Sequence, residues 1–172
     1  MAITLTLTPT MTIRVDDETA AALASQLDAS GFHAHLDLTS TSPDREKFGE
    51  DHVIWGRHTG GSGHYAQPEW RLGDDEVAEA YYAAVHGKAK VFFDLLIERP
   101  GQRLSTDDIR RLAPGVFGND HAIAGSVKGL SKPQRACGRR YPFYWWQDRP
   151  TRYSMKPSVA ELFAGARARL GD

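Results

Sequence analysis

The sequence predicts an α+β protein in which a small α/β module, residues 1–72, precedes a mainly helical domain, residues 73–172. Three patterns lead to this prediction. Apolar residues alternate with threonines near the start of the chain, which is typical of a half-buried strand. After Gly73 the apolar residues recur at helical spacing. An aromatic run at residues 141–146 then lies between helical stretches and indicates one strand of a hairpin.

The composition is that of a globular protein with one ordinary core or two small ones. Of the 172 residues, 41% are hydrophobic and 25% are charged. Cys137 is the single cysteine, which excludes an internal disulfide and a zinc site built on two cysteines of this chain. No apolar run approaches the roughly 20 residues that span a bilayer, and the opening segment lacks the basic leader of a signal peptide. We therefore expect a cytoplasmic protein without membrane contact.

The N-terminal module is predicted to run strand, strand, helix, strand over residues 3–38. Its exposed alternating strand favours pairing with a second copy, so we expect homodimerisation through this module, unless the module only completes the fold. Residues 39–72 are rich in Ser, Thr, Pro, Gly and His and are predicted to be a connector. Trp55 and Trp70 indicate that this connector still packs against something.

Helices and one hairpin are predicted over residues 77–170. Each helix has an apolar face and a cap or stop at its ends. The expected spans are 77–99, which Gly87 splits, 106–113 after the cap Ser105, 120–132, and 158–170, with the hairpin at 141–155. In helix 120–132, Ile123, Val127 and Leu130 face inward, and Lys132-Pro133 is expected to end or kink it.

The order helix, helix, helix, hairpin, helix resembles that of the winged helix-turn-helix DNA-binding superfamily. The stretches that carry the resemblance are Lys90 to Leu96, Leu104 to Leu112, Asp120 to Leu130, and Tyr141 to Trp146 with Arg152 to Met155 as the wing. The resemblance implies that helix 120–132 is the recognition helix. The sequence departs from the pattern at residues 114–119, because this turn is longer than the three or four residues of a tight helix-turn-helix.

The charge of the chain is divided unevenly, which its net charge of −1 conceals. Residues 1–80 hold fourteen acidic and five basic side chains, whereas residues 81–172 hold eight acidic and sixteen basic ones. Eight of the basic residues lie within 119–156 against two acidic ones, so this stretch carries +6. Because screening limits each charge to a reach of roughly 10 Å, such a stretch attracts polyanions whatever the charge of the whole chain.

The resemblance and the charges together predict a surface for double-stranded DNA. Helix 120–132 would lie in a major groove, the wing tip would reach an adjacent groove or backbone, and the start of helix 106–113 would offer backbone N–H groups to a phosphate. Gly125 and Gly129 would let a backbone approach closely, either that of DNA or of a packed helix. The predicted contact residues are Ser105, Thr106, His121, Ser126, Lys128, Lys132, Arg135, Arg139, Arg140, Arg149 and Arg152.

The aromatic run at 141–146 has two interpretations. Its rings could stack on unpaired bases beside the basic residues. The interpretation that we favour is that alternate rings bury against the helices, as a wing strand requires.

Other chemistry is weakly indicated. His52, His58 and His64 recur every six residues and could bind zinc, but this spacing matches no helical or strand face. Cys137 lies between arginines that could lower the pKa of its thiol and make it a redox sensor. No nucleophile triad or carboxylate pair stands out, so we expect neither an enzyme nor a bound cofactor.

The sequence therefore predicts a DNA-binding protein, a transcriptional regulator or another small DNA-associated factor, cytoplasmic and associated with the nucleoid if it binds DNA. The alternative is a winged helix that serves as a protein-interaction module and does not bind DNA. In that case an acidic partner, or the acidic N-terminal half of the chain itself, would meet the basic face.

Overall fold

The computed structural model describes residues 47–59 and 66–171. The chain divides into two compact units, residues 1–40 and 41–172, and every described residue belongs to the second. The strands and helix predicted over residues 3–38, and with them the edge proposed for homodimerisation, lie outside the described residues. Within the described ranges, no helix is both long and apolar enough to cross a membrane.

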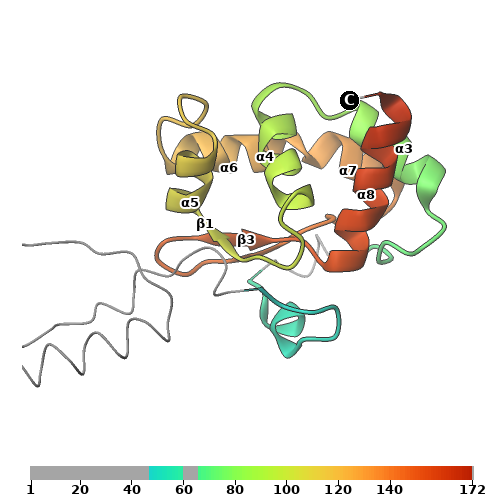
Figure 1. The fold of residues 1–172 in the computed structure, drawn as a ribbon, viewed down its shortest axis with the longest axis horizontal. Helices are drawn as coiled ribbons and strands as arrows, with labels where there is room; N and C mark the ends of the chain where they lie inside the picture. Colours follow the sequence, from blue (N-terminus) through green and yellow to red (C-terminus); the bar gives the residue numbers. More distant parts are fainter. Residues whose placement is uncertain (1–46, 60–65, 172) are drawn as a thin grey trace, which may run out of the picture. The chain divides into compact units, whose positions relative to one another are not determined.

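The described unit is an α+β fold, as predicted, with helices packed on a small antiparallel sheet (Figure 1). In chain order its elements are the 3₁₀ helix η2 (Val53–Arg57), α3 (Asp75–Ala83), α4 (Gly87–Ile97), β1 (Leu104–Ser105), α5 (Thr106–Leu112), α6 (Asp120–Gly129), α7 (Ser131–Cys137), β2 (Tyr144–Trp146), β3 (Arg152–Ser154) and α8 (Pro157–Leu170). The predicted split at Gly87 is confirmed, because α3 ends at Ala83 and α4 begins at Gly87.

The sheet has the strand order β1-β3-β2, so β3 lies in the middle and pairs antiparallel with both neighbours. Successive side chains of a strand point to opposite faces. Tyr153 of β3 packs against Phe92 of α4, with ring centres 5.1 Å apart, which defines the face covered by the helices. Tyr144 and Trp146 of β2 belong to a separate aromatic cluster on the other face. The sheet is therefore buried on both sides.

The main core lies between the helices and the first face of the sheet. Its centre consists of side chains with no exposed surface from α4, α6 and α8, among them Phe92, Ile123 and Phe163. Trp70 joins this core against Phe163, with ring centres 4.8 Å apart, and donates its indole N–H to the carbonyl of Arg140 at 2.8 Å. The sequence prediction that Trp70 packs against the fold is confirmed.

The predicted kink near Pro133 is confirmed, but the break lies earlier. The helix α6 ends at Gly129, Leu130 links it to α7, and Pro133 occupies the first turn of α7. A proline ring clashes with the carbonyl four residues before it, here that of Gly129, whereas the first turn of a helix needs no N–H donor from it. The chain therefore breaks one turn upstream and then resumes a helix.

A segment that we call the strap, residues 47–59, crosses the second face of the sheet (Figure 1). It begins beside β1, where Lys47 bridges to Gln102 and the N–H of Phe48 donates to the carbonyl of Gly101 at 2.9 Å. It ends at the free edge of β2, where the N–H of Thr59 donates to the carbonyl of Trp145 at 2.8 Å. The strap is thus part of the folded unit, and the boundary predicted at residues 72 and 73 lies inside that unit.

The strap passes so close to Gly101 that only glycine fits there. Gly101 has φ +76°, and a Cβ at this position would lie 2.3 Å from the carbonyl oxygen of Phe48. Gly115 has nearly the same φ, +79°, but a Cβ there would meet nothing within 4 Å. The two glycines thus share a left-handed backbone that would strain any other residue. They differ only in that Gly101 also contacts the strap.

We predict that Gly101→Ala destabilises the protein more than Gly115→Ala and releases the strap. Gly115→Ala should cost about 1 to 2 kcal/mol from its left-handed backbone alone. Denaturant unfolding measures both variants, and tryptic cleavage after the exposed Arg57, located by mass spectrometry, measures release of the strap. Equal losses of stability and equal cleavage in the two variants would contradict the prediction.

Candidate nucleic-acid interface

The helix α6 is held with its predicted apolar face inward. The side chain of Asn119 caps its first turn by accepting from the N–H of Ala122 at 3.0 Å. Ile123 and Leu130 have no exposed surface, and Val127 is half-buried against the core. A Cβ at Gly129 would lie 3.3 Å from the Cβ of Ala89, so Gly129 serves the contact between α6 and α4.

The opposite side of α6 and α7 carries the exposed cations that the sequence predicted. We call Lys128, Lys132 and Arg135 the basic ridge; all three are exposed and recur at intervals of four and three residues. Arg135 donates to the carbonyl of its neighbour Ser131 at 3.2 Å. No carboxylate in the described ranges forms an ion pair with these three residues. A polyanion would therefore displace no described carboxylate from them.

Beside the basic ridge, the surface of α6 carries small side chains or none. Gly125 lies on the exposed side of α6, and a Cβ there would meet nothing within 4 Å. His121 and Ala124 are also exposed on this helix. The backbone of α6 is thus open to close approach at Gly125, whereas Gly129 meets the packed helix α4, the other neighbour predicted for these glycines.

Ser126 is not on this surface. It is 6% exposed, and its hydroxyl donates to the carbonyl of Ala122 at 3.0 Å. Three residues after Ile123 and four before Leu130, it lies on the same side of the helix as these buried residues. The prediction that Ser126 contacts a base edge is therefore wrong for this conformation.

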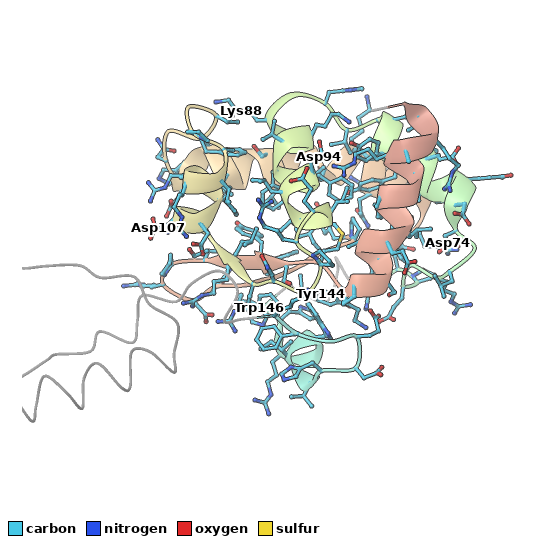
Figure 2. All side chains as sticks on the ribbon, viewed as in Figure 1. Asp74, Lys88, Asp94, Asp107, Tyr144 and Trp146 are labelled. Carbon is cyan, nitrogen blue, oxygen red and sulfur yellow. The ribbon has the colours of Figure 1, made fainter. Side chains whose placement is uncertain are left out.

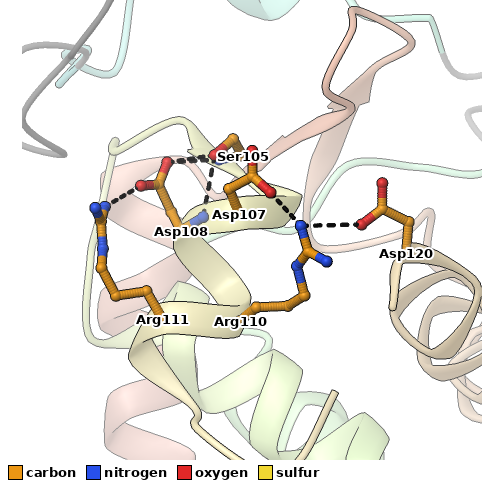
Figure 3. A network of polar contacts seen from close by, with 6 residues as sticks. All are labelled: Ser105, Asp107, Asp108, Arg110, Arg111 and Asp120. Atoms are coloured by element: carbon orange, nitrogen blue, oxygen red, sulfur yellow. Dashed lines mark hydrogen bonds and ion pairs between the residues drawn. The ribbon is translucent and has the colours of Figure 1, made fainter. Parts of the chain in front are cut away.

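The start of α5 is also occupied by internal contacts (Figure 3). Ser105 forms the capping box with Asp108: its hydroxyl accepts from the N–H of Asp108 at 3.1 Å, and its own N–H donates to that carboxylate at 3.0 Å. The N–H of Thr106 donates to the carbonyl of Thr151 at 3.0 Å, and Thr106 is 3% exposed. These N–H groups have no room for a phosphate, which corrects the roles predicted for Ser105 and Thr106.

A feature that the sequence did not reveal links α5 to the start of α6. Arg110 forms an ion pair with Asp107 and lies 3.9 Å from the carboxylate of Asp120 (Figure 3). Asp107 and Asp120 are exposed. The N-terminal end of α6 therefore presents carboxylates beside His121, while the cations gather at its C-terminal end and on α7.

Arg139 and Arg140 are drawn away from the ridge. Gly138 ends α7 with φ +64° and redirects the chain. Arg139 then donates from Nε and Nη2 to the two carboxylate oxygens of Asp74, at 3.0 and 2.6 Å. Arg140 pairs with Glu69 and also donates to the hydroxyl of Tyr144. Both arginines are held by carboxylates of the chain itself, and their predicted contact with DNA would have to break these ion pairs.

The wing tip keeps one exposed cation. Arg149 lies exposed in the turn between β2 and β3. Arg152 is held by Asp148, with Nη1 3.4 Å from Oδ2, and Arg103 binds the same carboxylate at 3.0 Å. Of the two wing arginines predicted to contact DNA, Arg149 is exposed and Arg152 is committed to an internal pair.

The favoured interpretation of the aromatic run is confirmed. Tyr141 and Phe143 are buried in the main core, and Trp145 is half-buried against it. Tyr144 and Trp146 are each 4% exposed and lie between the sheet and the strap (Figure 2). None of the five rings lies open to a base in this conformation.

The histidine and cysteine hypotheses gain no support. In the described ranges no three His, Cys, Asp or Glu side chains are grouped to hold a metal ion, and His64 lies outside them. The Nδ1 of His52 accepts from the N–H of Ile54 at 3.1 Å as a helix cap. Burial raises the pKa of the Cys137 thiol, which outweighs the lowering by Arg139. A thiol with a raised pKa is a poorer redox sensor than the sequence suggested.

Comparison with known proteins gives one match. Residues 75–170 match the model of a family of unknown function, DUF6416. No curated protein and no solved structure matches the chain. The matched range begins with α3 and ends with α8, so it includes the basic ridge and the sheet but not the strap.

The ion pair between Arg139 and Asp74 predicts a pH-dependent stability. The hydrogen bonds from Arg139 hold the pKa of the Asp74 carboxyl below its ordinary value. A lowered pKa stabilises the folded state above the unfolded-state value, about 3.9, and this contribution is lost as the pH falls below it. We therefore predict that Asp74→Asn lowers the free energy of unfolding at neutral pH and that its difference from wild type shrinks below about pH 4.

Urea unfolding at a series of pH values tests this prediction. Glu76→Gln is the matched control, because Glu76 is an exposed carboxylate at the start of the same helix and forms no ion pair with a described residue. A difference between Asp74→Asn and wild type that stays constant down to low pH would show that the ion pair does not contribute.

Proposed function

We propose that this chain, which belongs to the family of unknown function DUF6416, binds double-stranded DNA through a winged helix. In this proposal α6 and α7 face the major groove and the hairpin of β2 and β3 is the wing. The protein would act as a transcriptional regulator or another small DNA-associated factor, in the cytoplasm and on the nucleoid. Neither catalysis nor a cofactor is required for this role.

The order of the elements supports the winged helix. The helices α4, α5 and α6 are followed by the hairpin of β2 and β3 and then by α8. The short strand β1 pairs with β3 and so attaches the hairpin to the segment between α4 and α5. The fold departs from the winged-helix pattern at the long turn before α6 and at the break at Leu130. Because of this break, the residues of the basic ridge are divided between α6 and α7.

The observation that carries the proposal is the basic ridge. Its three side chains are exposed on the adjoining helices α6 and α7, and no described carboxylate pairs with them. Exposed Gly125 beside them permits close approach of a phosphate backbone. Contacts of this kind bind DNA through its backbone and make affinity depend steeply on salt. Arg149 at the wing tip would add a separate backbone contact.

A protein-interaction role is the second proposal, and the acidic end of α6 favours it. Asp107 and Asp120 would meet the phosphates of DNA if the N-terminal end of α6 entered a groove, as the first residues of a recognition helix do. Their pairing with Arg110 neutralises only part of this charge. An acidic protein that contacts only the C-terminal half of the surface would avoid this repulsion. This alternative predicts no affinity for duplex DNA even at low salt.

We predict that Lys128→Ala with Lys132→Ala weakens duplex binding and flattens its salt dependence. Each lost phosphate contact should reduce the slope of log K against log salt by about 0.9. Fluorescence anisotropy with a random-sequence duplex over a salt series measures both quantities. Arg57→Ala is the control, because Arg57 is an exposed cation on the strap, across the sheet from the helices. No binding by the wild-type chain at low salt would decide for the protein-interaction role.

A further inference from the structure

The face of the sheet beneath the strap is aromatic. Tyr144 and Trp146 are two residues apart on β2, so both side chains point to this face, where Figure 2 shows them between the sheet and the strap. They form a cluster separate from the main core, to which the strap adds the buried ring of Trp55. An antiparallel sheet of a soluble protein commonly turns a polar face to water. Here the second face is a platform of rings that needs a cover.

A cation lies against each ring of this platform. The guanidinium of Arg140 is 5.3 Å from the ring centre of Tyr144, and that of Arg103 is 5.3 Å from the ring centre of Trp146. Each cation is bound to a carboxylate: Arg140 to Glu69, and Arg103 to Asp148. Rings flanked by cations are what proteins use to bind single-stranded nucleic acid, with bases on the rings and phosphates on the cations.

The strap supplies a ring and a carboxylate in the places where a base and a phosphate would lie. The ring of Trp55 lies 5.3 Å from that of Tyr144 and 6.2 Å from that of Trp146. The carboxylate of Glu50 accepts from the N–H and the hydroxyl of Ser158, at 3.0 and 2.8 Å, at the start of α8. Lys156 lies 3.8 Å from the same carboxylate. Backbone and hydroxyl donors beside a lysine suit a phosphate oxygen equally well.

The strap leaves donors on this face unsatisfied. The indole N–H of Trp146 and the hydroxyl of Ser154 are buried and have no hydrogen-bond partner among the described residues. Ser154 lies opposite Tyr144 in the sheet register and has no exposed surface. Leaving a buried donor unpaired costs free energy that a better matched ligand recovers. The strap is therefore an incomplete match for the face that it covers.

The strap is held more by polar contacts than by buried apolar area. Of its residues only Trp55 is buried, and it shares no side chain with the main core. Its ends are held at opposite edges of the sheet by the backbone bonds from Phe48 to Gly101 and from Thr59 to Trp145. A segment with so little buried apolar area opens at a lower free energy than the whole domain.

We propose that the strap is an internal stand-in for a ligand, and that the face beneath it binds single-stranded nucleic acid when the strap leaves. Bases stack on Tyr144 and Trp146, and a phosphate replaces the strap's Glu50 carboxylate beside Lys156 and Ser158. This site lies across the sheet from the helices and does not depend on the basic ridge. In the closed form the strap also occupies a backbone carbonyl at the free edge of β2, that of Trp145.

The test compares strap variants for binding of labelled oligo-dT and oligo-U by fluorescence anisotropy. Trp55→Ala removes the buried ring, and Trp55→Ala with Glu50→Lys also places a cation beside Lys156, so both open the strap without altering the sheet. We expect either variant to bind both oligonucleotides at least about tenfold more tightly than wild type, the gain that one base–aromatic stack supplies. Circular dichroism melting checks that the main core stays folded.

Two further variants separate this site from the basic ridge. Adding Trp146→Ala to Trp55→Ala should abolish the gain in oligonucleotide affinity. Adding Lys128→Ala and Lys132→Ala to Trp55→Ala should leave that gain intact. Failure of the duplex proposal and failure of this one are therefore distinguishable. Val53→Ala is the matched strap control, because Val53 is 65% exposed and contacts neither ring. It should bind as wild type does.

A synthetic peptide of residues 47–59 completes the test. It should compete with the oligonucleotides for the Trp55→Ala variant, because both occupy one site. If the variant that combines Trp55→Ala with Glu50→Lys is folded but binds neither oligonucleotide, the proposal is overturned. If it binds the peptide but no oligonucleotide, the face is a site for an aromatic peptide that carries a carboxylate, and the proposal is equally overturned.

Discussion

The alternation of aromatic side chains along β2 requires a cover on both faces of a three-stranded sheet. Trp145 points to the helices, and Tyr144 and Trp146 point away from them. Helices cover the first face, but the second is too apolar to be left to water. The strap meets this need with one buried tryptophan and with backbone bonds at both edges of the sheet. The wing and the strap both depend on this doubly buried sheet, whereas α6 is positioned by its packing against α4.

Electrostatic pairing divides the cations of the chain into two groups. Arg139, Arg140 and Lys156 are bound by carboxylates from other parts of the chain and hold α7, β2 and α8 against the segments that supply them. The basic ridge of Lys128, Lys132 and Arg135 has no such partner in the described ranges. On the other side of the sheet the strap supplies one of these internal carboxylates, that of Glu50 beside Lys156.

Burial sets the chemistry of the titratable groups in the same unit. It raises the pKa of Tyr144 to about 12, since the phenolate form would lose its hydration beneath the strap. It lowers the pKa of His58, and the charge of Arg140 adds to this effect. Both groups are therefore neutral at physiological pH, and the face beneath the strap keeps its positive charge on the arginines and Lys156.

Short-range signals in the sequence determined the local structure well. The capping box at Ser105, the break between α3 and α4 at Gly87 and the kink before Pro133 each depend on residues within about one helical turn of each other. The inward face of α6 followed from the spacing of Ile123, Val127 and Leu130. The strand β1 was not predicted, because two residues carry no periodicity and are extended only through pairing with β3.

Taken alone, the sequence determined the α+β class, the order of the helices and hairpin, and an excess of positive charge over residues 119–156. Only the tertiary structure decided which of those charges are exposed. Asp74 and Glu69 are 65 and 71 residues from the arginines that they bind, and no local pattern reports such a pairing. The strap was hidden for the same reason, since a stretch with one buried tryptophan has no period and is ordered only by the sheet that it covers.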